Sequence, residues 1–210
     1  LCMALMPKLL GISPGDHGCG RTLTWIVQGA VQGGLRGLIL REPHLSTTAY
    51  VELARRLSPL LGPGLILHGS HPEAVHIAAR SGWGLHMPAS MDWTGVREQT
   101  KGWLGASCHT AEDLETARDA EVDYVTLGPV FEPLSKHNDE QRCIGLEGLN
   151  NLADHIELPV FAVGGINEEN AESIARLNVH GIGCMSFLFP PEADADSSSE
   201  CATQLLAVLG

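Results

Sequence analysis

Aromatic side chains, basic side chains and paired cysteines are all scarce in this chain. Aromatic residues make up 5% of the 210 residues, so the core is expected to consist of Leu, Ile, Val and Ala. The chain has 13 basic and 25 acidic residues, and its formal net charge of −12 argues against nucleic acid and anionic membranes as partners. Six cysteines without CxxC spacing favour reduced thiols and a cytoplasmic protein.

Long hydrophobic runs are also missing. The apolar N-terminal segment is interrupted by Pro7 and Lys8, is too short to cross a bilayer and lacks the basic start of a signal peptide. A length of 210 residues suits one domain, residues 1–210, with a sizeable core. Because the sequence begins at Leu1 without an initiator methionine, a domain excerpted from a longer chain is an open alternative.

Short apolar segments alternate with segments of helical periodicity along the whole chain. Strands are predicted at 8–12, 37–40, 64–67, 84–87, 103–107, 124–127, 160–163 and 181–185. Four helices are predicted with both bounds, at 24–32, 47–61, 145–155 and 201–209. Four more are predicted with less definite bounds: one that ends at Arg80, one within 91–101, one that follows the cap Thr110, and one that starts within 167–170 and ends at Leu177. Residues 194–200 are predicted to be a solvated loop. Eight such units indicate a single (β/α)8 TIM barrel. A doubly wound sheet is the alternative, but residues 15–20 lack its GxGxxG spacing.

Glycine ends two of the predicted strands, at Gly128 and at Gly164-Gly165. A strand, a glycine pair and a helix start at 167–170 form either a phosphate-binding turn or an ordinary tight turn. In many barrels the loops after the last two strands hold phosphate, which here selects Gly164, Gly165 and Ser186. The other residues expected at the ligand-binding end of the barrel are Arg41, His68, His86, Ser107 and Phe131.

The segment from Tyr124 to Leu152, followed by PVFAVGGI and GCMSFLF, resembles the thiamine phosphate synthase/TenI family. That family shows DYxxxGPxFxTxTK, a GLE segment, an AxGGI strand and a VSxI-type last strand. The resemblance extends to Gly105–Thr110, to Arg41-Glu42 and to Gly84–His86, so it spans most of the chain.

The resemblance implies a barrel that binds thiazole phosphate and, in the synthases, joins it to a pyrimidine pyrophosphate with Mg²⁺. By that resemblance, Gly164, Gly165 and Ser186 hold the thiazole phosphate. Ser135 and Lys136 stand where a hydroxyl and an ammonium group meet phosphoryl oxygens. Arg41 stands for the arginine that contacts pyrophosphate, and Ser107 for the serine near the reacting centre.

The chain also departs from the family pattern. Both magnesium carboxylates are missing after the third and fourth strands, where His68–His71 and Pro88–Met91 stand, so no Mg²⁺ site and no other cofactor are expected. His-Met-Pro after the fourth strand is closer to the thiazole tautomerases. However, the acid/base histidine of those enzymes is replaced by Pro129, as in the synthases.

His68, His71 and His86 offer a substitute for the missing histidine, because imidazole titrates near neutral pH. A zinc site at these histidines is less favoured, since their spacing matches no known pattern. His86 and Lys136 are therefore the candidate catalytic residues. We expect a protein of thiamine biosynthesis, with tautomerase chemistry favoured over pyrimidine–thiazole coupling. The alternative is a catalytically inactive phosphate-binding or regulatory barrel. The expected partner is a small phosphorylated thiazole-like ligand, and a homo-oligomer is compatible with the sequence.

Overall fold

The computed structural model describes residues 6–15, 21–132 and 143–210. In this part of the chain, eight parallel strands pair in sequence order, and β8 pairs with β1, so that the sheet closes into a barrel. The strands are β1 Leu9–Ile12, β2 Gly37–Leu40, β3 Leu65–His68, β4 Gly84–Met87, β5 Leu104–Cys108, β6 Tyr124–Leu127, β7 Val160–Val163 and β8 Gly181–Cys184. The predicted (β/α)8 barrel is confirmed.

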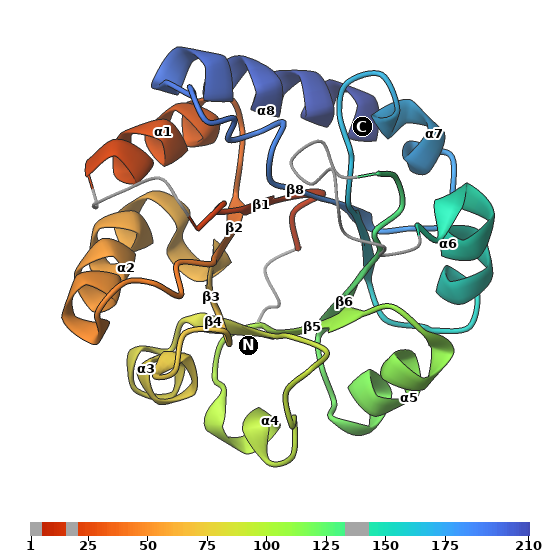
Figure 1. Cartoon of the computed structure of the whole chain (residues 1–210), viewed down its shortest axis with the longest axis horizontal. Coiled ribbons are helices and arrows are strands. Elements are labelled where there is room, and N and C mark those ends of the chain that lie inside the picture. Colours follow the sequence, from red (N-terminus) through yellow and green to blue (C-terminus); the bar gives the residue numbers. More distant parts are fainter. Residues whose placement is uncertain (1–5, 16–20, 133–142) are drawn as a thin grey trace.

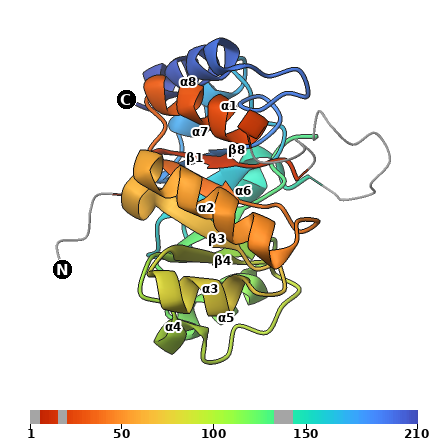
Figure 2. The ribbon, with the colours of Figure 1, turned by 90° about the vertical axis from the view of Figure 1, so that its left-hand side faces the viewer.

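The helices form a ring around the strands, as seen down the barrel in Figure 1 and from the side in Figure 2. They are α1 Arg21–Gln32, α2 Thr47–Leu61, α3 Ala74–Ser81, α4 Val96–Gln99, α5 Ala111–Asp119, α6 Gly145–Ala153, α7 Ala171–Ala175 and α8 Ala195–Leu209, with a 3-10 turn, η1, at Gly62–Gly64. Within the described residues, no helix is long and apolar enough to cross a membrane.

The strand side chains fill two separate layers, because successive residues of a strand point to opposite faces. Leu10, Ile39, Ile66, Tyr124 and Phe161 form a small cluster of their own inside the barrel. Their neighbours in the sequence, such as Leu9 and Leu38, belong to the larger cluster that packs beneath the helices. The inner layer therefore carries two of the few aromatic side chains.

Two glycines let α1 and α8 approach closely where the first and last units meet. A Cβ on Gly29 would lie 1.9 Å from the carbonyl oxygen of Ala195, and one on Gly33 would lie 2.1 Å from that of Ser199. Both helices lie side by side in Figures 1 and 2. Only a residue without a side chain fits at these contacts, so this glycine pair closes the helical ring.

The start of α8 differs from the prediction. Residues 194–200 were expected to form a solvated loop, but α8 already begins at Ala195. Asp194 caps the helix, because its carboxylate accepts the N–H of Ser197 and the Ser197 hydroxyl accepts the N–H of Asp194. The acidic, serine-rich composition of this segment thus marks a helix N-terminus.

The start of α7 also differs from the prediction. Asn167–Asn170 was expected to begin the helix, yet α7 begins at Ala171 and has five residues. The side-chain oxygen of Asn167 accepts the N–H groups of Glu169 and Asn170, while that of Asn170 accepts the N–H of Asn167. These bonds form a turn that takes the place of the first helical turn. The backbone N–H groups of Asn167, Glu169 and Asn170 are therefore occupied.

Candidate active site at the C-terminal end of the barrel

The parallel strands bring most of the predicted site residues to one end of the barrel. Arg41 follows β2, His68 ends β3, and His86 and Ser107 lie near the ends of the paired strands β4 and β5. Gly164-Gly165 follows β7, and Ser186 follows its neighbour β8. Ser135 and Lys136 lie outside the described residues. The strand order thus brings these residues to the same end of the barrel, and their role in ligand binding stays a prediction.

His86 is the centre of a hydrogen-bonded chain of three side chains. Its Nε2 atom lies 2.9 Å from the Ser107 hydroxyl, and its Nδ1 atom lies 3.0 Å from the Tyr124 hydroxyl. His86 is 2% exposed and Tyr124 is fully buried, whereas Ser107 is half-buried. His86 thus lies behind Ser107, and of these three side chains Ser107 is the one with a surface facing the barrel opening.

Burial, and to a lesser extent the neighbouring His68, holds the pKa of His86 well below its usual value of 6.5. Burial likewise holds the pKa of the Tyr124 hydroxyl well above 10. Both groups are therefore neutral at physiological pH. A neutral imidazole between two hydroxyl groups can exchange hydrogen bonds with both, but it carries no charge.

His68 lies beside this chain, with its ring stacked on that of His86 at a centroid distance of 5.7 Å. Its Nδ1 atom accepts the backbone N–H of Ser70 at 3.2 Å and lies 2.8 Å from the Ser70 hydroxyl. Burial and the charge of Arg41 lower the pKa of His68 to about 4. At neutral pH this side of the barrel opening therefore presents an uncharged aromatic ring.

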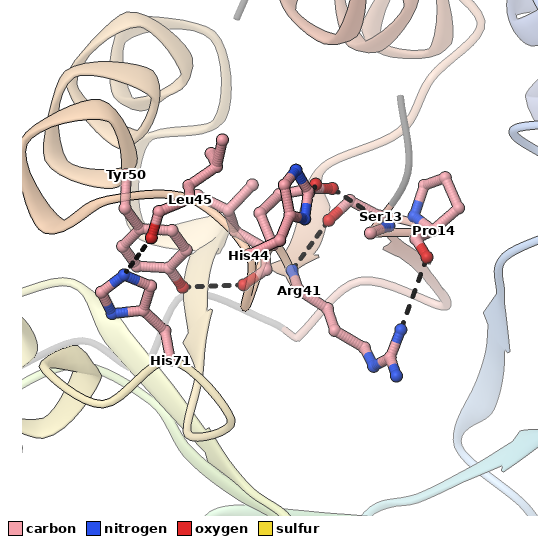
Figure 3. Close-up of polar contacts among 10 residues, drawn as sticks. Ser13, Pro14, Arg41, His44, Leu45, Tyr50 and His71 are labelled. Atoms are coloured by element: carbon pink, nitrogen blue, oxygen red, sulfur yellow. Dashed lines mark hydrogen bonds and ion pairs between the residues drawn. The ribbon is translucent and has the colours of Figure 1, made fainter. Parts of the chain in front are cut away.

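Arg41 supplies a positive charge to the same region. Its backbone N–H donates to the buried Ser13 hydroxyl at 2.7 Å, which joins the ends of β1 and β2. Figure 3 shows its guanidinium extending away from α2, with one nitrogen 3.4 Å from the carbonyl oxygen of Pro14. That contact is long and is the one hydrogen bond of this guanidinium within the described residues, so its other donors can serve an anionic ligand.

His71 is separated from the other two histidines. Its ring stacks on that of Tyr50, with centroids 4.0 Å apart, and its Nε2 atom lies 3.2 Å from the carbonyl oxygen of Leu45 (Figure 3). The Tyr50 hydroxyl donates to the carbonyl oxygen of Leu40 and accepts the N–H of His68. This arrangement anchors the loop after β3 to α2, which indicates a structural role for His71.

The glycine pair after β7 packs closely against the loop after β6. Gly164 and Gly165 have φ values of 97° and 64°, a backbone region that favours glycine. A Cβ on Gly164 would lie 2.5 Å from that of Pro129, and one on Gly165 would lie 2.5 Å from the carbonyl oxygen of Glu132. Both glycines are therefore required by the packing of the loop after β6, whether or not a phosphate binds.

Two polar groups near the pair remain available to a ligand. Among the described residues, the backbone N–H of Gly165 and the hydroxyl of Ser186 have no hydrogen-bond partner. Ser186 is half-buried in the turn that follows β8, beside β7. One N–H and one hydroxyl at neighbouring strand ends can hold part of an anion.

The donor set does not fit the Mg²⁺ ion of the synthases. Asp92, the first carboxylate after β4, accepts hydrogen bonds from the N–H and hydroxyl of Thr94. The Glu42 carboxylate is buried, accepts the N–H of Gly15 and lies 3.8 Å from Nδ1 of His44. Among the described residues, no group of three His, Cys, Asp or Glu side chains could hold a metal ion. Within the described part of the chain, the carboxylates of Asp92 and Glu42 are thus already bonded to protein donors.

Tyr124 is the site residue that the sequence interpretation missed. The sequence pattern places Tyr124 in a core strand and in a family motif, without a role in the site. A tyrosine hydroxyl inside a barrel needs a hydrogen-bond partner, which was the available signal. The partner itself was not predictable, because His86 lies 38 residues away in the sequence.

The strand pairing and the helical ring define a (β/α)8 barrel protein, and a cluster of polar side chains lies at the C-terminal end of its strands. Comparison with known proteins identifies the particular family. The sequence model of the thiamine monophosphate synthase family matches residues 10–188. The chain belongs to this family, and the predicted resemblance is confirmed.

Individual relatives agree with that assignment. The thiamine-phosphate synthase of Archaeoglobus fulgidus is 30% identical over 197 residues, which cover 92% of this chain and 90% of the relative. That of Chloroflexus aurantiacus is 31% identical over 199 residues, which cover 90% and 87%. Thiamine phosphate pyrophosphorylase from Pyrococcus furiosus has a TM-score of 0.81 and 24% identity, covering 96% of this chain and 95% of that one. This last likeness concerns the fold.

Proposed function

We propose that the chain binds a phosphorylated thiazole at the C-terminal end of the barrel and acts in cytoplasmic thiamine biosynthesis. Membership of the thiamine monophosphate synthase family supports the ligand class. The unpaired N–H of Gly165 and hydroxyl of Ser186 support a phosphate position after β7 and β8. Arg41 adds a cation in the same end of the barrel.

The reaction that we favour is a tautomerisation, and the observation that carries it is the contact between Ser107 and His86. A tautomerisation takes one proton from the ligand and delivers one to another of its atoms. A hydroxyl with one proton and two lone pairs can do both at the same oxygen, so Ser107 ends unchanged. A hydrogen bond from the His86 imidazole would stabilise negative charge on the Ser107 oxygen during the exchange.

Coupling of the thiazole to a pyrimidine pyrophosphate is the second candidate, and the names of the relatives favour it. That reaction needs compensation for the charge of the leaving pyrophosphate, to which Arg41 would contribute one cation. The buried position of His86 is also compatible with the third candidate, an inactive binding domain.

Calorimetry with thiazole phosphate tests the ligand. We expect saturable binding, weakened about tenfold or more in Ser186→Ala, because a hydrogen bond to a charged group contributes about 1.5–3 kcal/mol. The exposed Ser81→Ala variant, at the end of α3 and before β4, lies at the opposite end of the barrel; it is the matched control and should bind normally. If thiazole phosphate does not bind, the proposal is wrong.

Two activity assays separate the reactions. In heavy water, a tautomerase should introduce solvent deuterium into the ligand, and Ser107→Ala should slow this about 100-fold or more while binding persists. A second assay mixes both substrate halves with Mg²⁺ and measures thiamine phosphate. Efficient coupling would exclude our preference for the tautomerase, and absence of both activities with intact binding would identify a binding domain.

A further inference from the structure

The Tyr124 hydroxyl lies at the closed end of the Ser107–His86–Tyr124 chain. Tyr124 is fully buried in the barrel interior, where the Phe161 ring packs nearly perpendicular to its own, with centroids 5.5 Å apart. Among the described residues, Nδ1 of His86 is the one hydrogen-bond partner of the hydroxyl. We propose that Tyr124 is a positioning residue that fixes His86 as the tautomer protonated at Nε2, so that the Ser107 hydroxyl faces the ligand as a hydrogen-bond donor.

The two neutral tautomers of His86 satisfy the buried groups unequally. If Nδ1 carried the proton, it would donate to the Tyr124 oxygen, and the phenol's own proton would have no acceptor in the apolar interior. If Nε2 carries the proton, the phenol donates to Nδ1 and Nε2–H donates to Ser107, so every buried donor is paired. An unpaired buried donor costs enough to favour the second form roughly 5- to 150-fold.

The surroundings of the chain keep it in this neutral form. Phe161 packs against the inner side, and within the described part of the chain no hydrogen bond continues beyond the Tyr124 hydroxyl. Burial opposes ionisation of both the imidazole and the phenol. Tyr124 therefore keeps its proton, and the chain of side chains orients hydrogen bonds without carrying a proton through the barrel.

The tautomer determines what Ser107 offers to a ligand. Because the Ser107 oxygen accepts Nε2–H, its own proton is directed away from His86. Ser107 is half-buried, so this proton reaches the barrel opening. The ligand atom that meets Ser107 is then an acceptor, such as a ring nitrogen or an oxygen. This last step rests on the proposed function, whereas the tautomer of His86 does not.

Nitrogen NMR of histidine tests the tautomer directly. In ¹⁵N-histidine-labelled protein at pH 7.5, protonated and unprotonated ring nitrogens have well-separated chemical shifts. His86→Gln identifies the His86 signals among those of the 10 histidines, by their disappearance. We expect Nε2 protonated and Nδ1 unprotonated. A protonated Nδ1, an equal mixture or a doubly protonated ring would overturn the proposal.

Removing the phenol hydroxyl tests the role of Tyr124. In Tyr124→Phe, Nδ1 of His86 has no partner in either tautomer, so the preference for one tautomer should weaken. The chemical shifts of Nδ1 and Nε2 should then move toward each other, because both tautomers of His86 are populated. Tyr50→Phe is the matched control, because the only other tyrosine is also buried and its hydroxyl bonds Leu40 and His68 instead. Unchanged His86 shifts in Tyr124→Phe would show that Tyr124 does not set the tautomer.

The wild-type spectrum decides the tautomer even if Tyr124→Phe fails to fold. Failure of the proposed function is seen separately, as absence of thiazole phosphate binding with the His86 shifts as expected. In the opposite case, binding with the wrong tautomer would leave the function in place and overturn the assignment for Tyr124.

Discussion

Gly105 makes room for the Tyr124 ring, and Gly105→Ala is the sharpest test of the barrel interior. A Cβ at this position in β5 would lie 2.1 Å from Cζ and 2.5 Å from the hydroxyl oxygen of Tyr124. To restore a carbon contact of about 3.5 Å, the ring must move by about 1.4 Å. Phe161 packs against the ring, so this movement also strains the contact to His86.

The expected destabilisation is about 3 kcal/mol, from overpacking and from a weakened buried hydrogen bond. For a chain of this length, that lowers the melting temperature by about 6–12 °C. Gly11→Ala is the control in β1, since its Cβ would meet only side-chain ends at 3.1 Å or more and should cost about 1 kcal/mol.

Calorimetric melting of wild type, Gly105→Ala, Tyr124→Leu and the double variant measures the coupling between the two positions. Leucine lacks the ring atoms that the new methyl group would touch. The double variant should therefore be more stable than the sum of the single effects predicts, by 1 kcal/mol or so. A melting temperature of Gly105→Ala within about 2 °C of wild type would refute the packing argument.

Two further predictions concern the helical ring and pH. Gly29→Ala should lower the free energy of unfolding in urea by about 3 kcal/mol or more, because its Cβ would overlap Ala195. The exposed control Gln28→Ala should be nearly neutral. Helix propensity alone predicts that Gly29→Ala stabilises the protein, so a gain in stability would contradict close packing of α1 and α8. His68 has a pKa of about 4 in the folded protein and 6.5 ordinarily, so the unfolded chain binds its proton first as pH falls. The contribution of His68 to the free energy of unfolding is therefore fully present only above pH 6.5. It should fall by about 2 kcal/mol on acidification to pH 5. His68→Gln should flatten that slope, and an unchanged slope would show that His68 is not responsible.

Much of the fold was readable from local patterns. The strand at 84–87 was predicted to the residue, and so was the end of α2 at Leu61; the cap of α2, predicted as Ser46 or Thr47, is Ser46. Thr110 also caps its helix as predicted, in a capping box with Asp113. Such signals are local, because apolar runs and caps depend on residues only a few positions apart.

The errors occurred where two local preferences compete or where packing decides. The polar segment 194–200 has the composition of a loop, yet its helix is held by the Asp194 cap and by contact with α1. Asparagine is common at helix starts, but the side-chain oxygens of Asn167 and Asn170 accept backbone N–H groups and form a turn instead. Neither outcome is contained in the hydrophobic pattern.

The sequence by itself determined the alternation of strands and helices, and hence the end of the barrel where Arg41, His86, Ser107 and Ser186 would gather. Only the tertiary structure decided how these residues meet. Barrel closure places His86 between Ser107 and Tyr124, buries it and makes it neutral, and it fills the space above Gly164-Gly165 with the loop after β6. The physical reason is range: periodicity and caps are set by neighbours in the chain, whereas burial, hydrogen-bond partners and pKa depend on strands that only the closed sheet brings together.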